Sequence, residues 1–385
     1  MKRRRTGTFE ITAVAGERVR AFIPAPLPPA PAITFQGDLQ IDLERATLAL
    51  GRLDGVSALL PDHTLFLYSY VRKEAVLSSQ IEGTQSSLSD LLLFELEEAP
   101  GVPLGDVTEV SNYVSALEHG VRRVRGGFPL SSRLLREIHA VLLSRGRGSG
   151  KQPGEFRKTQ NWIGGSRPGN AAFVPPPHTA IAGSMSDLER FLHAEGDGLP
   201  LLARAGIAHL QFETIHPFLD GNGRVGRLLV TLMLCAAGVL QEPLLYLSLF
   251  LKKHRQRYYT LLDAVRRDGD WESWLSFFFQ GVDETATSAI SNAHALTKLF
   301  RDDRARIERQ GRRAGSALRV HDAFKARPIS SVAAISHATG LSFPSAASAV
   351  ELLASMKIVR ELTGKRRNRL FVYDEFLTLL SDETT

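Results

Sequence analysis

Apolar residues recur at helical spacing along most of the chain. In residues 42–56 and 66–76 they stand three and four positions apart, which places them on one face of an α-helix. Similar apolar stretches predict further helices at 110–124, 134–142, 180–192, 199–212, 228–240, 254–265 and 271–279. Residues 228–240 are the most apolar of these and predict a central buried helix. The fold class is therefore expected to be mainly α.

Residues 157–163 and 171–174 are the clearest extended segments. They flank a turn-rich loop, and three prolines after the second segment keep it out of the centre of a sheet. We expect a surface β-hairpin, whose free edge could hold a peptide through main-chain hydrogen bonds. Residues 24–31 are rich in proline and favour an extended conformation, so residues 1–40 are expected to be an arm over the helical body without a core of its own.

The C-terminal part changes character. Residues 331–337 and 344–356 predict two helices, and residues 358–362 and 370–373 predict two strands, which is the layout of a winged helix. The loop between the strands carries a basic patch that could contact phosphates, namely Lys365, Arg366, Arg367 and Arg369. DNA binding and a protein-packing role stay equal alternatives, which the salt dependence of a gel shift would separate.

Length and composition predict a globular protein of several domains. The expected units are an arm at 1–40, an N-terminal helical region at 41–128, a core domain at 129–282, a connecting helix at 283–315 and the winged-helix domain at 316–385. A net charge of +6 permits acidic partners without requiring them. The single cysteine, Cys235, fits a reducing compartment. No signal peptide or bilayer-spanning stretch is present, since a span needs about 20 apolar residues, so we expect a cytoplasmic protein without a membrane partner.

Residues 216–227 concentrate the chemistry. His216 can take a proton near neutral pH, and Asp220 is an oxygen ligand of the kind that Mg²⁺ prefers. Residues 221–223 are Gly-Asn-Gly, whose backbone N–H groups can form an anion-binding nest at the start of the following helix. Arg224 and Arg227 stand three apart and share one helix face. Together these groups indicate phosphoryl or nucleotidyl transfer.

This segment resembles the Fic family signature, His-x-Phe-x-(Asp/Glu)-Gly-Asn-Gly-Arg-x-x-Arg, and matches it at every fixed position. The resemblance implies a Fic-type helical domain that transfers AMP from ATP to a Tyr, Thr or Ser hydroxyl of a target protein and of itself. It also implies that residues 157–175 are a flap hairpin on which the target docks.

The resemblance assigns a role to each matching residue. It implies that His216 is the base, that Asp220 holds Mg²⁺, that Arg224 steadies the β-phosphate and that Arg227 takes the γ-phosphate. Asn222 joins His216 and the two arginines in the catalytic set. The implied nucleotide-binding residues are Gly221, Asn222, Gly223, Arg224, Val225, Gly226, Arg227 and either or both of Tyr258 and Tyr259.

Ser78-x-x-x-Glu82-Gly83 resembles the inhibitory motif of the same family. The resemblance implies that Glu82 pairs with Arg227, and one guanidinium cannot hold a carboxylate and a γ-phosphate in the same bidentate way. Gly83 also has an ordinary explanation as a helix terminator.

Several alternatives stay open. The same site could remove AMP from a modified target, with Glu82 orienting a water, or the protein could be a nucleotide-sensing DNA-binding regulator. His209, His216 and Asp220 could instead be ligands of a transition-metal hydrolase, but that reading leaves both arginines unexplained. A homodimer is a further expectation.

Overall fold

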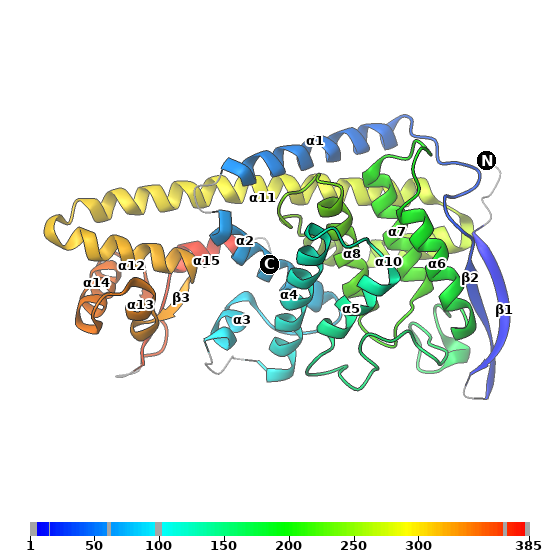
Figure 1. The fold of residues 1–385 in the computed structure, drawn as a ribbon, viewed down its shortest axis with the longest axis horizontal. Helices are drawn as coiled ribbons and strands as arrows, with labels where there is room; N and C mark the ends of the chain where they lie inside the picture. The colour runs from blue at the N-terminus through cyan, green and yellow to red at the C-terminus, as the bar shows by residue number, and fades with distance from the viewer. Residues whose placement is uncertain (1–5, 15, 60–62, 97–101, 365–367, 382–385) are drawn as a thin grey trace.

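The structure is a computed structural model that describes residues 6–14, 16–59, 63–96, 102–364 and 368–381. It confirms the mainly helical fold that the sequence predicts (Figure 1). The helices are α1 (Asp38–Leu59), α2 (His63–Ile81), α3 (Leu88–Glu95), α4 (Leu104–Arg125), α5 (Ser132–Leu142), α6 (Ile181–Leu192), α7 (Leu201–Ile215), α8 (Asn222–Ala236), α9 (Ser248–Lys253), α10 (Arg255–Asp268), α11 (Trp271–Glu308), α12 (Ala314–Ala326), α13 (Val332–Thr339), α14 (Phe343–Ser355) and α15 (Asp374–Ser381). The strands are β1 (Gly7–Val14), β2 (Glu17–Pro24), β3 (Ile329–Ser331), β4 (Arg360–Glu361) and β5 (Leu370–Val372).

Helices α7 and α8 form the buried centre of the molecule. Almost every residue of both helices is buried, including polar and charged residues that lie near residues 216–227. Gly206 lets α11 approach α7 closely, because a Cβ there would lie 2.9 Å from the ring of Phe278. The indole of Trp274 donates to the carbonyl of Gly206 over 2.9 Å. The loop between α7 and α8 carries the segment 216–222 and is thereby fixed at both ends.

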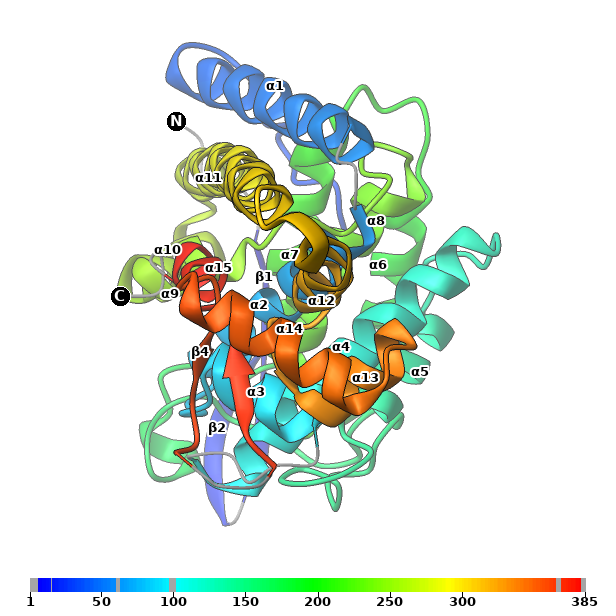
Figure 2. The ribbon, with the colours of Figure 1, turned by 90° about the vertical axis from the view of Figure 1, so that its left-hand side faces the viewer.

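Helix α11 is one continuous helix of 38 residues. The sequence predicts a helix that ends at 279 and a separate connecting helix at 283–315, but the expected boundary at 282/283 falls inside α11. The helix continues through Gly281 because this glycine packs closely against Phe250. A Cβ at Gly281 would lie 2.6 Å from the ring of Phe250. Figures 1 and 2 show α1 beside α11, with which it makes the most extensive helix contact in the described chain.

The N-terminal arm contains a β-hairpin, whereas the sequence predicts only an extended, proline-rich arm. Strands β1 and β2 pair antiparallel from Gly7↔Pro24 to Val14↔Glu17. Val19 and Ala21 are buried, whereas Arg18 and Arg20 are exposed. This alternation is the period of two that a half-buried strand requires. The amide of Phe22 donates to the carbonyl of Val174 over 2.9 Å, which joins the hairpin to the flap.

The flap itself is less regular than a hairpin of two strands. Within residues 157–175 the ladder consists of one antiparallel bridge, Ile163↔Phe173, with N–H···O distances of 2.8 and 3.1 Å. Three successive prolines after Val174 supply no N–H donors that could extend it. The shape of the flap therefore depends on side chains, which are described below.

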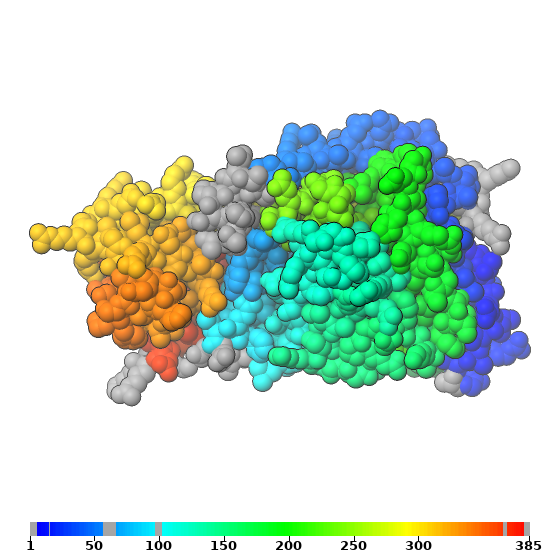
Figure 3. Space-filling model, viewed as in Figure 1, coloured from blue at the N-terminus to red at the C-terminus, as the bar shows by residue number. Residues whose placement is uncertain are grey.

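The C-terminal unit lies at the opposite end of the molecule from the N-terminal hairpin (Figure 3). Its helices α13 and α14 and strands β4 and β5 occupy the expected stretches, and β3 adds a strand, giving the antiparallel order β3-β5-β4. Winged-helix function stays a prediction: residues 365–367 of the basic loop lie outside the described residues, and Arg369 is paired with Glu351 at 2.5 Å and Glu361 at 3.6 Å.

No helix in the described ranges is both long and apolar enough to cross a bilayer.

Candidate functional site

His216 ends α7 in an unusual backbone conformation. Its φ of 49° and ψ of 61° are left-handed, which costs a non-glycine residue about 1 kcal/mol or more. The buried guanidinium of Arg157 donates to the carbonyl of His216 over 2.9 Å, and the amide of His216 donates to Phe212 over 2.9 Å. These bonds hold the residue in place and turn the chain from α7 into the glycine loop.

The glycine loop forms the N-terminus of α8. Gly221 has a φ of 75°, which glycine adopts without strain. The side chain of Asn222 closes the loop, since it accepts from the amide of Phe218 over 2.8 Å and donates to its carbonyl over 2.9 Å. Asn222 is buried, so in this structure it shapes the nest, and the first backbone N–H groups of α8 form an anion-binding end.

Glu82 lies over this nest. It follows the C-terminus of α2, and its Oε1 accepts from Arg227 Nη2 over 2.8 Å. Arg227 also donates to the hydroxyl and carbonyl of Ser78 over 2.8 and 3.0 Å. A Cβ at Gly223 would clash with Glu82 Oε1. The ion pair expected from the sequence is therefore present, and a carboxylate stands where an anion would meet the nest.

The charge on Glu82 is stabilised by this arrangement. Burial alone would raise the pKa of its carboxyl group, but Arg227 opposes burial and the pKa lies below the ordinary value of 4.5. Glu82 is consequently ionised at neutral pH, and it pairs with Arg227 as a full negative charge.

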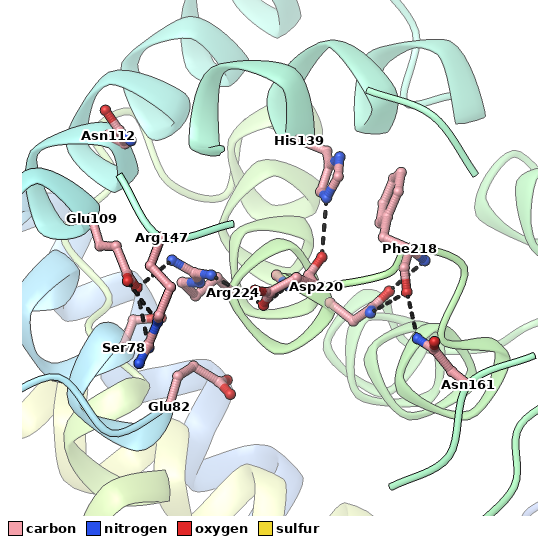
Figure 4. A network of polar contacts seen from close by, with 12 residues as sticks. Ser78, Glu82, Glu109, Asn112, His139, Arg147, Asn161, Phe218, Asp220 and Arg224 are labelled. Carbon is pink, nitrogen blue, oxygen red and sulfur yellow. Dashed lines mark hydrogen bonds and ion pairs between the residues drawn. The ribbon is translucent and has the colours of Figure 1, made fainter. Parts of the chain in front are cut away.

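Arg224 points away from Arg227. Its side chain, 2 % exposed, donates to Glu109 Oε2 over 3.1 Å and reaches Asp220 Oδ1 at 3.5 Å (Figure 4). Asp220 keeps 38 % of its side chain exposed, while its carbonyl faces His139 Nε2 at 3.0 Å. Asp220 can therefore offer an accessible carboxylate oxygen. Within the described residues no group of three or more His, Cys, Asp or Glu side chains could hold a metal by itself.

His216 is a neutral base in this environment. Its ring nitrogen Nδ1 is buried and has no hydrogen-bond partner among the described residues. Burial, followed by the neighbouring charges of Arg157 and Arg266, lowers the pKa of His216 to about 3. The imidazole is therefore uncharged at neutral pH, with one ring nitrogen able to accept a proton, and a nearby polyanion would raise its pKa again.

Other residues expected at a nucleotide site lie in the interior. Val225 is fully buried, and Gly226 faces α7, where its carbonyl lies 2.8 Å from His209 Nδ1. Tyr258 is buried as well, with its hydroxyl 2.9 Å from His209 Nε2. The side chain of Tyr259 is 41 % exposed. Of the two tyrosines, Tyr259 is therefore the one accessible to a ligand.

The same contacts weigh against a transition-metal site. Both ring nitrogens of His209 are engaged by Gly226 and Tyr258, so His209 is a buried structural histidine. Burial lowers its pKa to about 4, which keeps the ring neutral.

Two arginines near His216 were not expected from the sequence. Arg157 donates to the carbonyls of His216 and Thr159 over 2.9 Å each and to that of Pro176 over 2.5 Å. Arg266 donates to Thr214 Oγ1 over 3.1 Å, and its guanidinium lies 3.9 Å from the ring centre of Phe173. Both guanidiniums connect the flap to the end of α7.

Comparisons with known proteins agree with this geometry. The sequence model described as Fic/DOC family N-terminal matches residues 41–122, and that of the Fic/DOC family matches residues 129–234. The chain is 34 % identical over 198 residues to the protein adenylyltransferase Fic of Culex quinquefasciatus. The aligned residues cover 49 % of this chain and 36 % of that relative. It is 34 % identical over 133 residues to the protein of the same name from Drosophila grimshawi, covering 34 % and 25 % of the two chains.

A solved structure supports the fold. A Fic family protein from Desulfovibrio desulfuricans G20 superposes with a TM-score of 0.58 at 19 % identity and covers 89 % of this chain and 97 % of that one. The chain spans only about a third of the length of the Culex relative, at 36 %.

Proposed function

The chain belongs to the Fic/DOC family, and we propose that it transfers AMP from ATP to a Tyr, Thr or Ser hydroxyl of a protein. The observation that carries the proposal is the carboxylate of Glu82 at the nest of α8, paired with Arg227. An anion already sits at the helix N-terminus beside an arginine and a neutral imidazole. The relatives' printed name, protein adenylyltransferase, names the same reaction.

The proposed reaction uses each group once. The triphosphate binds at the N–H groups of α8, with Arg227 on its terminal phosphate. His216 accepts the proton of the target hydroxyl, the hydroxyl oxygen forms a bond to the α-phosphorus, and the bond from that phosphorus to the β-phosphate oxygen breaks. Pyrophosphate leaves. Most of the acceleration would come from positioning and charge stabilisation.

Asp220 is the residue that would hold Mg²⁺. Its exposed carboxylate fits a metal that is typically bound by one or two carboxylates and substrate phosphates. When bound, Mg²⁺ would neutralise phosphate charge.

The target segment is proposed to dock on the flap at residues 157–175. Strand β2 already bonds to Val174, so the edge of residues 158–163 is the side on which another strand could add. Trp162, with 38 % of its surface exposed, lies on this segment. Main-chain pairing there would bring a side-chain hydroxyl toward His216 without a strong demand on the target sequence.

Glu82 is proposed to inhibit this reaction, and its replacement provides the main test. Glu82→Gly removes the competing carboxylate, so transfer should rise by about tenfold or more, since each 1.4 kcal/mol recovered at the phosphate site is worth a factor of ten. The measurement is incubation of the purified protein with Mg²⁺ and [α-³²P]ATP, with mass spectrometry to identify an added AMP.

The matched control is the double variant Glu82→Gly/His216→Ala, which should not label. Equal labelling of the wild type and Glu82→Gly would refute inhibition by Glu82, and labelling by the double variant would show that His216 is not the base. Removal of AMP from a pre-modified protein by the wild type, but not by Glu82→Ala, would assign the reverse reaction, which stays a prediction.

A further inference from the structure

Four charged side chains form a chain of contacts that ends at Asp220, beside the glycine loop (Figure 4). Arg147 Nε lies 2.9 Å from Glu109 Oε1, Glu109 Oε2 accepts from Arg224 over 3.1 Å, and Arg224 reaches Asp220 at 3.5 Å. The middle pair is buried, with Glu109 1 % and Arg224 2 % exposed. The ends of the chain are accessible, with Arg147 60 % and Asp220 38 % exposed.

The loop after α5 places Arg147 near Asp220. Arg147 stands between Gly146 and Gly148, whose φ values of 76° and 93° are left-handed and suit glycine. A Cβ at Gly148 would lie 3.2 Å from Asp220 Oδ2, so the loop rests directly against the carboxylate proposed to hold Mg²⁺. Asn112 secures the loop by donating to the carbonyl of Arg145 over 2.9 Å.

The charge of Glu109 is shared by two arginines. A buried carboxylate is strongly unfavourable unless it is paired, and the buried Arg224 already supplies one partner. Arg147 contacts Glu109 through Nε and, at 3.5 Å, through Nη2, while most of its side chain faces solvent. A guanidinium has five N–H donors, so one that is held from one side can still bind a phosphate from the other.

We propose that Arg147 is a third phosphate-binding arginine of this site, which contacts the terminal phosphates of the nucleoside triphosphate while Glu109 holds Arg147 and Arg224 in position. The proposal rests on the proposed function and deepens it. It makes Glu109 a positioning residue, and it gives the loop that carries Arg147 a role in selecting triphosphates over monophosphates.

The test compares two nucleotides on the full chain. In a Glu82→Gly parent, dissociation constants for ATP and AMP are measured by isothermal titration calorimetry in the presence of Mg²⁺. Arg147→Ala should weaken ATP binding by about tenfold, the factor that corresponds to one charge-assisted contact, and leave AMP binding within about twofold. Arg147→Lys should be intermediate, because an ammonium keeps the charge but loses the fork of donors.

Arg145→Ala is the matched control. It removes the same charge from the same exposed loop, two residues away, but not the contact to Glu109, so both affinities should stay within about twofold of the parent. Equal losses of ATP affinity for Arg145→Ala and Arg147→Ala would overturn the inference. An Arg147→Ala variant that binds ATP as tightly as the parent, or that loses as much affinity for AMP as for ATP, would overturn it too. A parent that binds neither nucleotide would overturn the proposed function as well.

Discussion

Glu213 lies one helical turn before His216 and is the most unusual carboxyl group near the site. Its side chain faces α8, where a Cβ at Gly226 would lie 2.5 Å from Glu213 Oε1. That oxygen is buried and has no hydrogen-bond partner among the described residues. Burial raises the pKa of Glu213 to about 7. Gly226, assigned from the sequence to nucleotide binding, is therefore explained by the space that this carboxyl group needs.

The raised pKa of Glu213 predicts a pH-dependent cost to stability. Below the ordinary pKa of 4.5 the group is protonated in the folded and unfolded states and costs nothing; the cost grows as the pH rises to about 7 and is constant above it. Glu213→Gln should therefore raise the free energy of unfolding by up to about 3 kcal/mol at pH 8 and change it little near pH 4.5. Urea unfolding at both pH values measures the difference.

The exposed Glu118 supplies a control for this experiment. Glu118→Gln should change the free energy of unfolding little, since it replaces an exposed side chain on the surface rather than a buried one. A Glu213→Gln variant whose effect does not vary with pH would mean that the carboxyl group is not held protonated in the folded protein.

At the residue scale, the sequence identifies the groups of residues 216–227 and the pairing of Glu82 with Arg227, because both lie in motifs with fixed spacing. It does not identify Glu109, which is 115 positions away from Arg224 and immediately precedes the apolar stripe predicted at 110–124. The one feature that could have pointed to Glu109 is its place beside this apolar stripe, where the packing of α4 buries its carboxylate. Only the fold shows which cation compensates for that burial.

At the scale of elements, the flap is held by Arg157. One guanidinium joins both ends of the flap, through Thr159 and Pro176, to the carbonyl of His216. The single bridge of the flap gives it little rigidity of its own. In the proposed reaction, the alignment of a docked target with His216 would therefore depend on this side chain.

Arg157→Lys should slow transfer while leaving nucleotide binding intact. An ammonium cannot satisfy three divergent carbonyls, and losing one charge-assisted hydrogen bond costs about 1.5–3 kcal/mol, so the single-turnover rate in the Glu82→Gly background should fall by about tenfold or more. The ATP dissociation constant should stay within about twofold. The exposed Lys151, which lies before the flap, provides the control when it is replaced by Ala, and an Arg157→Lys variant with the parent's rate would show that the contacts of Arg157 are dispensable.

Most helices could be predicted from the sequence because their apolar residues follow the helical period over long stretches. The N-terminal hairpin could not, since the proline-rich residues 24–31 dominate the composition there, although the alternation of residues 18–21 was a visible strand signal. The sequence predicts too short a helix at the start of α11. A glycine such as Gly281 often marks a helix end, and only its packing against Phe250 shows that the helix continues. In both cases tertiary contacts decide between two local readings.

At the scale of the whole molecule, α11 is shared by the part that carries residues 216–227 and by the C-terminal unit. Phe300 packs edge to face on Phe376 with ring centres 5.2 Å apart, and the Tyr373 hydroxyl donates to Asp303 over 2.7 Å. The other end of the same helix carries Trp271 and Trp274 in the core. We expect the two parts to unfold together.

Tyr373→Phe tests this coupling. It leaves the buried Asp303 without one of its donors, which should cost about 1–3 kcal/mol of stability. All three tryptophans, at 162, 271 and 274, lie outside the C-terminal unit, so a lower urea midpoint in tryptophan fluorescence would report transmission along α11. A change in far-ultraviolet circular dichroism alone, with unchanged fluorescence, would show that the units unfold separately.

The unbroken course of α11 also constrains how this chain can vary in length. Each residue inserted into or deleted from a helix turns everything beyond it by about 100° and shifts it by about 1.5 Å. A single-residue insertion between Val282 and Leu296 would therefore rotate the C-terminal unit about the axis of α11, to another side of the rest of the molecule. A change in length close to a whole number of turns would restore the rotation of the unit about the helix axis. The number of residues in α11 therefore decides which face the C-terminal unit presents.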